Sequence, residues 1–121
     1  MEYKYNFKKE TPILETRLEE STKIREKYPN RVPIICERDT KSKLQMLEKT
    51  KYLVPDDLTI VQFYYIIRKK LSLDKNYGLS FLVNGKFSIA GENLISDIYS
   101  RYKDEDGFLY MTYTGELDKG C

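Results

Sequence analysis

The sequence contains no histidine. Histidine is the commonest general base near neutral pH and a frequent metal ligand, so most acid–base and metal-centred chemistry is excluded. Only two cysteines are present, Cys36 and Cys121, which are too few for a zinc site of their own or for a disulfide framework. We therefore expect a protein of the reducing cytosol that is not an enzyme and holds no catalytic residues, no metal and no cofactor.

Long apolar runs and an excess of one charge are also missing. The 121 residues include 21 Lys and Arg against 19 Asp and Glu, a net charge of +2. This balance argues against a dedicated nucleic-acid binder, which needs a basic surplus. No segment approaches the ~18 apolar residues of a membrane span, and no signal peptide is recognisable. The length suits one domain, which buries about two-thirds of its unfolded surface without disulfides.

Residues 1–30 are predicted to form a helical extension. Thr11 and Pro12 place a capping hydroxyl and a proline at a helix start, and Pro29 ends the helix. Its predicted apolar face comprises Leu14, Leu18, Ile24 and Tyr28. The preceding aromatic–polar alternation is compatible with a short helix or an extended arm, and we favour the short helix.

Residues 31–114 are predicted to form one ubiquitin-like domain. Thr59 and Gln62 form a capping box that starts a helix over 58–71, and Asn84-Gly85 is a strong turn signal. The other predicted elements are strands at 31–38, 50–55, 79–83 and 108–114, a helix at 93–102, and a loop at 39–49 with one helical turn at 44–47. Sequential pairing with right-handed crossovers then favours an α+β fold. It is a ubiquitin-like β-grasp roll, in which one helix crosses a four-stranded mixed sheet, plus two N-terminal helices.

The short strand ending at Pro55 allows two interpretations. If it lies at the sheet edge, its lysines prevent the unpaired backbone groups from pairing with unrelated chains. Alternatively, an extended peptide adds to it as a further strand, with side-chain pockets giving specificity. The surroundings favour the second: Leu58, Phe63 and Ile66 would flank one side, Ile24 and Pro33 the other, and Lys49, Lys51 and Lys70 would attract acidic residues. For each apolar residue, ordinary core packing is the alternative.

Three segments carry a resemblance that covers nearly the whole chain. They read KIREKYPNRVPIICER, EKTKYLVPDDLTIVQFYYIIRKK and KDEDGFLYMTYTGE. The sequence resembles the ubiquitin-like autophagy modifiers, the family of autophagy-related protein eight, microtubule-associated protein light chain three and the GABA-receptor-associated protein. The resemblance implies that a cysteine protease removes residues after a C-terminal glycine. Activating and conjugating enzymes would then join that glycine to phosphatidylethanolamine, marking autophagosomal membranes.

The resemblance also assigns residues. Gly120 would be the conjugation residue and Cys121 the residue removed, both within a flexible tail of residues 115–121. Adaptors and cargo receptors with an acidic aromatic-x-x-aliphatic motif would bind at two pockets. The aromatic pocket would comprise Glu20, Ile24, Pro33, Lys51, Leu53 and Phe108. The aliphatic pocket would comprise Tyr52, Val54, Pro55, Leu58, Phe63, Ile66 and Lys70.

Three alternatives remain open from sequence. Lys119 stands where the family usually has an aromatic residue before its glycine, which favours an unconjugated peptide-binding module of vesicle trafficking. Prenylation of Cys121 is a rival, although no C-a-a-X box exists. A nucleic-acid or microtubule-binding role is supported only by Lys8-Lys9 and by the basic run 68–70, so no nucleic-acid partner is expected.

Overall fold

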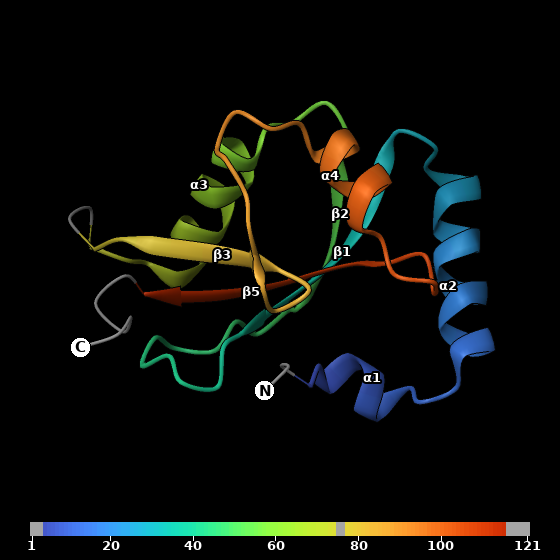
Figure 1. Ribbon diagram of the computed structural model, residues 1–121, viewed down its shortest axis with the longest axis horizontal. Helices are drawn as coiled ribbons and strands as arrows, with labels where there is room; N and C mark the ends of the chain where they lie inside the picture. The colour runs from blue at the N-terminus through green and yellow to red at the C-terminus, as the bar shows by residue number, and fades with distance from the viewer. Residues whose placement is uncertain (1–3, 75–76, 116–121) are drawn as a thin grey trace.

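The computed structural model describes residues 4–74 and 77–115, which form four helices and five strands (Figure 1). In chain order they are α1 (Asn6–Glu10), α2 (Leu14–Lys27), β1 (Arg31–Arg38), β2 (Lys51–Pro55), α3 (Ile60–Leu71), β3 (Leu79–Val83), β4 (Phe87–Ser88), α4 (Ile95–Tyr102) and β5 (Leu109–Gly115). The prediction of two N-terminal helices is confirmed. None of the described helices is long and apolar enough to cross a bilayer.

The strands form one mixed sheet in the order β2-β1-β5-β3-β4. β1 and β5 are parallel at its centre, and the other neighbours are antiparallel. This arrangement confirms the ubiquitin-like roll, but the prediction of four strands missed β4. That strand has only two residues, both exposed, which is too short for a periodic signal. The predicted turn at Asn84 and Gly85 leads into it, and both residues adopt positive φ (55° and 72°).

α3 covers one face of the sheet and builds the main core. Its capping box is confirmed, because the Thr59 N–H donates to Gln62 Oε1 at 2.8 Å and the Gln62 N–H donates to Thr59 Oγ1 at 3.3 Å. The helix buries four residues: Ile60, Phe63, Ile67 and Leu71. They pack with the alternate β1 residues Val32, Ile34 and Cys36, as their spacing predicts, and with the buried face of α4.

α1 packs on the opposite face of the sheet, below it in Figure 1. Phe7 joins a second apolar cluster whose other buried members are Tyr5, Ile35, Phe108 and Tyr110. The buried Glu37 carboxylate on β1 accepts the N–H groups of Asn6 at 2.8 Å and Phe7 at 3.0 Å. Because these first-turn N–H groups have no partner inside the helix, Glu37 stabilises α1 in its position against this face of the sheet.

The predicted start of α2 is wrong. The helix begins at Leu14, and its N-cap position is occupied by Ile13, which gives no side-chain cap. Thr11 lies outside the helix, and its carbonyl oxygen accepts a hydrogen bond from Arg17 Nη1 at 2.7 Å. The Arg17 side chain thus pairs a backbone carbonyl of the connecting segment, while the N-cap residue gives the first N–H groups of α2 no side-chain acceptor.

The predicted apolar face of α2 is wrong in part, because Leu18 and Tyr28 are 42% and 38% exposed, whereas Ile24 packs against the second apolar cluster. The fully buried positions are Arg17 and Ser21. They bond the polar segment before β5, so this helix docks through charge and hydrogen bonding as well as through Ile24.

Asp106 is the residue on which α2 docks. Its carboxylate is fully buried and accepts hydrogen bonds from Arg17 Nε at 2.8 Å, from the Phe108 N–H at 2.9 Å and from the Tyr110 hydroxyl. Its carbonyl oxygen accepts the Ser21 hydroxyl at 2.5 Å. Burial and the hydrogen bond to Asp106 raise the pKa of Tyr110. Burial, the largest single influence, lowers the pKa of Arg17, but the hydrogen bond to Asp106 together with the acidic groups of Tyr110, Asp106 and Asp104 raises that pKa overall.

The loop 39–49 contains no helical turn, contrary to the prediction for 44–47. It is held in irregular form by Tyr113 of β5, whose hydroxyl donates to the Gln45 carbonyl at 2.8 Å and accepts the Leu47 N–H at 3.0 Å. Leu44 is buried in the main core. These tertiary contacts satisfy the backbone groups that a helical turn would have paired.

The last strand is shifted by one residue from its prediction. β5 starts at Leu109 and includes Gly115, which pairs with Leu79 although the prediction placed Gly115 in the tail. Residues 116–121 lie outside the described residues. The division of the chain at 30 and 114 remains a prediction.

We expect Arg17→Met to lower the free energy of unfolding by about 3 kcal/mol or more, because it leaves the Asp106 carboxylate buried without its cation. Urea denaturation would measure the loss. The double variant Arg17→Met with Asp106→Asn should be more stable than Arg17→Met, because the unpaired charge is gone.

Lys23→Met is the matched control. It breaks an exposed pair with Glu19 (3.0 Å, side chains 73% and 68% exposed) on the same helix, which is expected to cost under ~1 kcal/mol. Equal losses for Arg17→Met and Lys23→Met would show that the buried pair does not hold α2.

We also expect stability to fall above about pH 10. Burial raises the pKa of Tyr113 to about 12 from its ordinary value of 10.0, and burial likewise raises those of Tyr52 and Tyr110. The folded state holds these protons more tightly than the unfolded state. The stability that these buried phenols contribute is therefore fully present below about pH 10. It is lost as the pH rises from 10 toward the raised pKa, which is about 12 for Tyr113.

Urea denaturation at about pH 8 and about pH 11 measures this loss. Tyr113→Phe should show a shallower alkaline decline, whereas Tyr65→Phe, at a 64% exposed position, should decline like the parent. A stability that increases between the two pH values would contradict the proposed burial of these phenols.

Candidate functional site

β2 lies at the edge of the sheet and pairs only with β1. The Cys36 N–H donates to the Thr50 carbonyl at 2.8 Å. This bond identifies Cys36 and Thr50 as a hydrogen-bonded pair of the antiparallel ladder and so fixes which β2 residues bond to β1. Since hydrogen-bonded positions alternate, Tyr52 and Val54 direct their backbone groups toward β1. Lys51 and Leu53 therefore direct theirs outward, so this edge offers a template for a further strand.

The two faces of β2 meet different layers of the protein. The side chains of Tyr52 and Val54 are buried in the main core beneath α3. Lys51 and Leu53 lie on the other face and are half-buried. A chain added at this edge would therefore have α3 on one side and the N-terminal helices on the other.

The predicted aromatic-pocket residues fall into a surface set and a buried set. Glu20 of α2 forms an ion pair with Lys51, and Leu53 lies opposite Pro33 across the β1–β2 ladder. Pro33 and Phe108 are buried, and Ile24 is half-buried against the Phe108 cluster. The structure thus brings Glu20, Lys51 and Leu53 to the surface, over the apolar side chains of Pro33, Phe108 and Ile24.

Proline lacks an N–H and therefore usually occurs at strand ends or exposed edges, but Pro33 is buried on an interior strand. Its nitrogen faces the β5 side, where the parallel ladder begins only at Ile34. The missing N–H therefore removes no ladder hydrogen bond.

The predicted aliphatic-pocket residues lie between β2 and α3. Phe63 is fully buried with its ring centroid 6.2 Å from that of Tyr52, so it is a core residue beneath the surface. Ile66, at 37% exposed, and Leu58, half-buried, are the accessible apolar groups. Pro55 and Lys70 are exposed at the rim, and Val54 is part of the core.

Sequence reasoning missed the contribution of the loop before β2. A cavity of about 310 Å³ is lined by Gln45, Met46, Leu47, Glu48, Lys49, Tyr52 and Lys70. Met46 is 59% exposed and has no sequence signal that distinguishes it from an ordinary loop residue. Its position follows from the contacts of Tyr113, which hold this loop beside α3.

The charge around the edge is net basic, with Lys49, Lys51 and Lys70 against Glu20 and Glu48. Lys49 lies 6.0 Å from the Tyr52 ring centroid and, with Lys70, borders the cavity. Lys51 lies 5.2 Å from the Phe7 ring centroid, so it contacts both α1 and its partner Glu20 on α2. An acidic extended chain therefore matches this edge in charge as well as in backbone geometry.

The remaining predicted residues, Gly120 and Cys121, lie outside the described residues. Within 4–74 and 77–115, no group of three or more Cys, Asp or Glu side chains is placed to hold a metal ion. The outward-facing backbone of Lys51 and Leu53 gives the β2 edge the geometry of a binding surface.

Comparison with known proteins matches most of the chain to one family. The family model described as autophagy protein Atg8, ubiquitin-like, matches residues 16–120. Autophagy-related protein 8b of Arabidopsis thaliana is 49% identical over 113 residues, covering 93% of this chain and 91% of that protein. Autophagy-related protein 8 of Schizosaccharomyces pombe is 48% identical over 102 residues, 84% of each chain. The crystal structure of Trypanosoma brucei ATG8 superposes with a TM-score of 0.87 at 40% identity, covering 94% of this chain and 97% of that one. The chain belongs to the Atg8 family of ubiquitin-like autophagy proteins.

Proposed function

We propose that this protein is a modifier joined through Gly120 to phosphatidylethanolamine after removal of Cys121. On autophagosomal membranes, it recruits adaptors and cargo receptors that carry an acidic aromatic-x-x-aliphatic motif. The outward-facing backbone of Lys51 and Leu53 at the sheet edge is the observation that carries the adaptor-binding part. Membership of the Atg8 family supports the conjugation part.

The conjugation chemistry belongs to partner enzymes, and this chain supplies the substrate. A processing cysteine protease hydrolyses the Gly120–Cys121 bond, and ubiquitin-like activating and conjugating enzymes transfer the glycine acyl group to the lipid amine. Glycine has no Cβ, so it fits a narrow enzyme channel. β5 ends at Gly115, so the chain to Gly120 extends at most ~17 Å from the folded domain.

Conjugation would also determine where the protein resides. One myristoyl-sized chain binds membranes only marginally, whereas the two acyl chains of a phospholipid, at ~0.8 kcal/mol per buried CH₂, anchor stably. The protein is thus cytoplasmic before conjugation and held on autophagosomal or related vesicle membranes afterwards.

Adaptor binding follows from strand addition at β2. The peptide backbone pairs with Lys51 and Leu53, while its aromatic and aliphatic side chains reach opposite faces of the edge. Ile66 and Leu58 contact the aliphatic side chain, and Lys49 and Lys70 attract the acidic flank. The second candidate, an unconjugated peptide-binding module, keeps this surface and omits the lipid. Lys119 before the glycine is the feature that favours it.

We expect an acidic aromatic-x-x-aliphatic peptide to bind with micromolar affinity, about −8 kcal/mol. Leu53→Ala and Ile66→Ala should each weaken binding by ~1 kcal/mol or more, because each removes an accessible apolar anchor. Calorimetry measures the change. Val61→Ala, at a 47% exposed position on α3 that was not assigned to either pocket, is the control and should bind like the parent. If all three variants bind equally well, the peptide does not occupy this edge.

We expect the protein recovered from starved cells to have lost Cys121 and to carry the mass of a phosphatidylethanolamine on Gly120. Gly120→Ala should abolish both the mass change and membrane association. A chain ending at Gly120 should be lipidated without the protease. Intact mass measurement reads each state directly.

A Lys119→Ala variant controls for general disturbance of the tail and should still be lipidated. Membrane association that survives Gly120→Ala would refute conjugation. A parent protein that keeps Cys121 after incubation with its cognate protease would favour the unconjugated module.

A further inference from the structure

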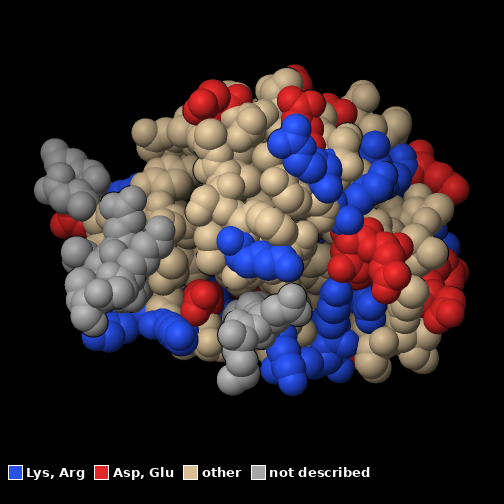
Figure 2. Space-filling view, viewed as in Figure 1, with Lys and Arg blue, Asp and Glu red and all other residues tan. Residues whose placement is uncertain are grey.

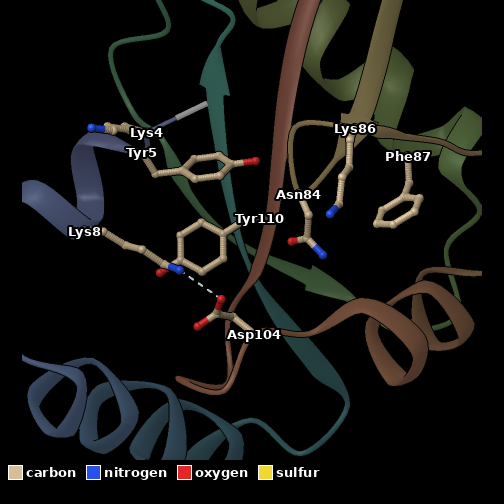
Figure 3. Close-up of a pocket in the computed structure, with 8 residues that line it drawn as sticks. All are labelled: Lys4, Tyr5, Lys8, Asn84, Lys86, Phe87, Asp104 and Tyr110. Carbon is tan, nitrogen blue, oxygen red and sulfur yellow. Dashed lines mark hydrogen bonds and ion pairs between the residues drawn. The ribbon is translucent and has the colours of Figure 1, made fainter. Parts of the chain in front are cut away.

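A second cavity of about 530 Å³ lies away from the β2 edge (Figure 3). It opens between α1, the β3–β4 turn and the segment that follows α4. Its lining residues are Lys4, Tyr5, Lys8, Asn84, Lys86, Phe87, Asp104 and Tyr110. A cavity of this size lies within the ~300–1,000 Å³ range of small-ligand sites. Three of its residues come from the N-terminal extension and five from the ubiquitin-like domain.

The charge of this cavity is net positive, with three lysines against one aspartate. Lys8 Nζ lies 2.9 Å from Asp104 Oδ1 and 4.7 Å from the Tyr110 ring centroid. Lys86 enters from the opposite wall, while Lys4 lies at the rim and points outward (Figure 3). In Figure 2, blue side chains lie along the lower edge of this face, and others lie at its centre and upper right. An anion in the cavity would lie between two ammonium groups.

Aromatic rings form the apolar surfaces of the cavity. Tyr5 and Tyr110 are buried with ring centroids 4.7 Å apart, and they form one wall. Phe87, 41% exposed, stands on the other side beside Lys86, whose Nζ is 5.2 Å from its ring centroid, and its ring also packs on Tyr102 with centroids 5.2 Å apart. Rings on both sides favour a flat aromatic group, which packs against the exposed part of Phe87 and the tyrosine wall.

The one carboxylate does not prevent anion binding. Asp104 is paired with Lys8, and its other oxygen accepts the Asp106 N–H at 3.2 Å. The negative charge of Asp104 is therefore already paired with Lys8, but it still repels an incoming anion. Removing that charge should strengthen anion binding, so a substitution at Asp104 tests whether the ligand is negatively charged.

We propose that this cavity binds an aryl phosphate, presented as a phosphotyrosine side chain of a partner peptide. A phosphate monoester carries about −1.5 to −2 charges at pH 7, which matches the lysine surplus. Its ring fits the aromatic walls, whereas a sugar or inositol phosphate would leave them uncovered. Because α1 supplies one wall, the bound ligand also fastens the N-terminal extension to the sheet. This site shares no residue with the peptide surface at β2.

The test titrates phenyl phosphate into the full chain and follows backbone amide shifts by NMR. We expect shifts at Lys8, Asn84 and Lys86, and weaker binding of inorganic phosphate. Lys8→Gln and Lys86→Gln should each weaken phenyl phosphate binding about fivefold, the value of one exposed charge pair. Asp104→Asn should strengthen it, because the amide oxygen keeps the Asp106 contact while the negative charge is lost.

Lys9→Gln is the matched control, since it makes the same charge change on α1 at a residue that does not line the cavity. Thermal unfolding of each variant shows whether α1 remains docked. A phosphotyrosine peptide should compete with phenyl phosphate, and its unphosphorylated form should not.

Three results would overturn the proposal. Equal weakening by Lys8→Gln and Lys9→Gln would indicate diffuse charge attraction. Equal affinity for inorganic and phenyl phosphate would exclude a role for the aromatic walls. Flotation on vesicles containing phosphatidylserine with the same lysine dependence, but no cavity shifts with phenyl phosphate, would identify a membrane surface instead.

Discussion

The docking of the N-terminal extension depends on the buried carboxylate of Asp106. Arg17 and Ser21 of α2 bind this residue, while Tyr110 and the Phe108 N–H hold it at the start of β5. A carboxylate without these partners would be too costly to bury, so the helix and the strand stabilise each other. The position of α2 then brings Glu20 to Lys51 and so completes one side of the β2 edge.

The extension also connects the two proposed binding sites. On α1, Phe7 contacts the cluster beside Lys51, while Lys8 and the preceding Tyr5 line the second cavity. Glu37 of β1 accepts two N–H groups from the first turn of this five-residue helix. Short helices are marginal alone, so α1 owes its order to these contacts, and a ligand in the second cavity would add to them.

An unpaired edge strand usually invites aggregation, and charged residues are the common protection. The lysines near β2 fit that role as well as the proposed one, because the same ammonium groups that repel a second copy of a basic edge attract an acidic peptide. In the Glu20–Lys51 pair, the carboxylate of Glu20 balances the positive charge of Lys51. Acidic peptides are thus preferred through charge complementarity, while backbone pairing supplies the docking geometry.

The sequence alone determined the elements with strong local signals and the family. The capping box at Thr59, the Asn84-Gly85 turn and the β-branched strand at 31–38 predict their own structure, because their stabilising contacts lie within a few residues. The tertiary structure decided what depends on distant partners. Arg17 is buried because Asp106 lies 2.8 Å away, and the loop 39–49 is irregular because Tyr113 replaces its backbone partners. Phe63 is buried and Ile66 is accessible, although both are apolar residues one turn apart on the same helix. Only the packing of that helix on the sheet decides which of the two is covered.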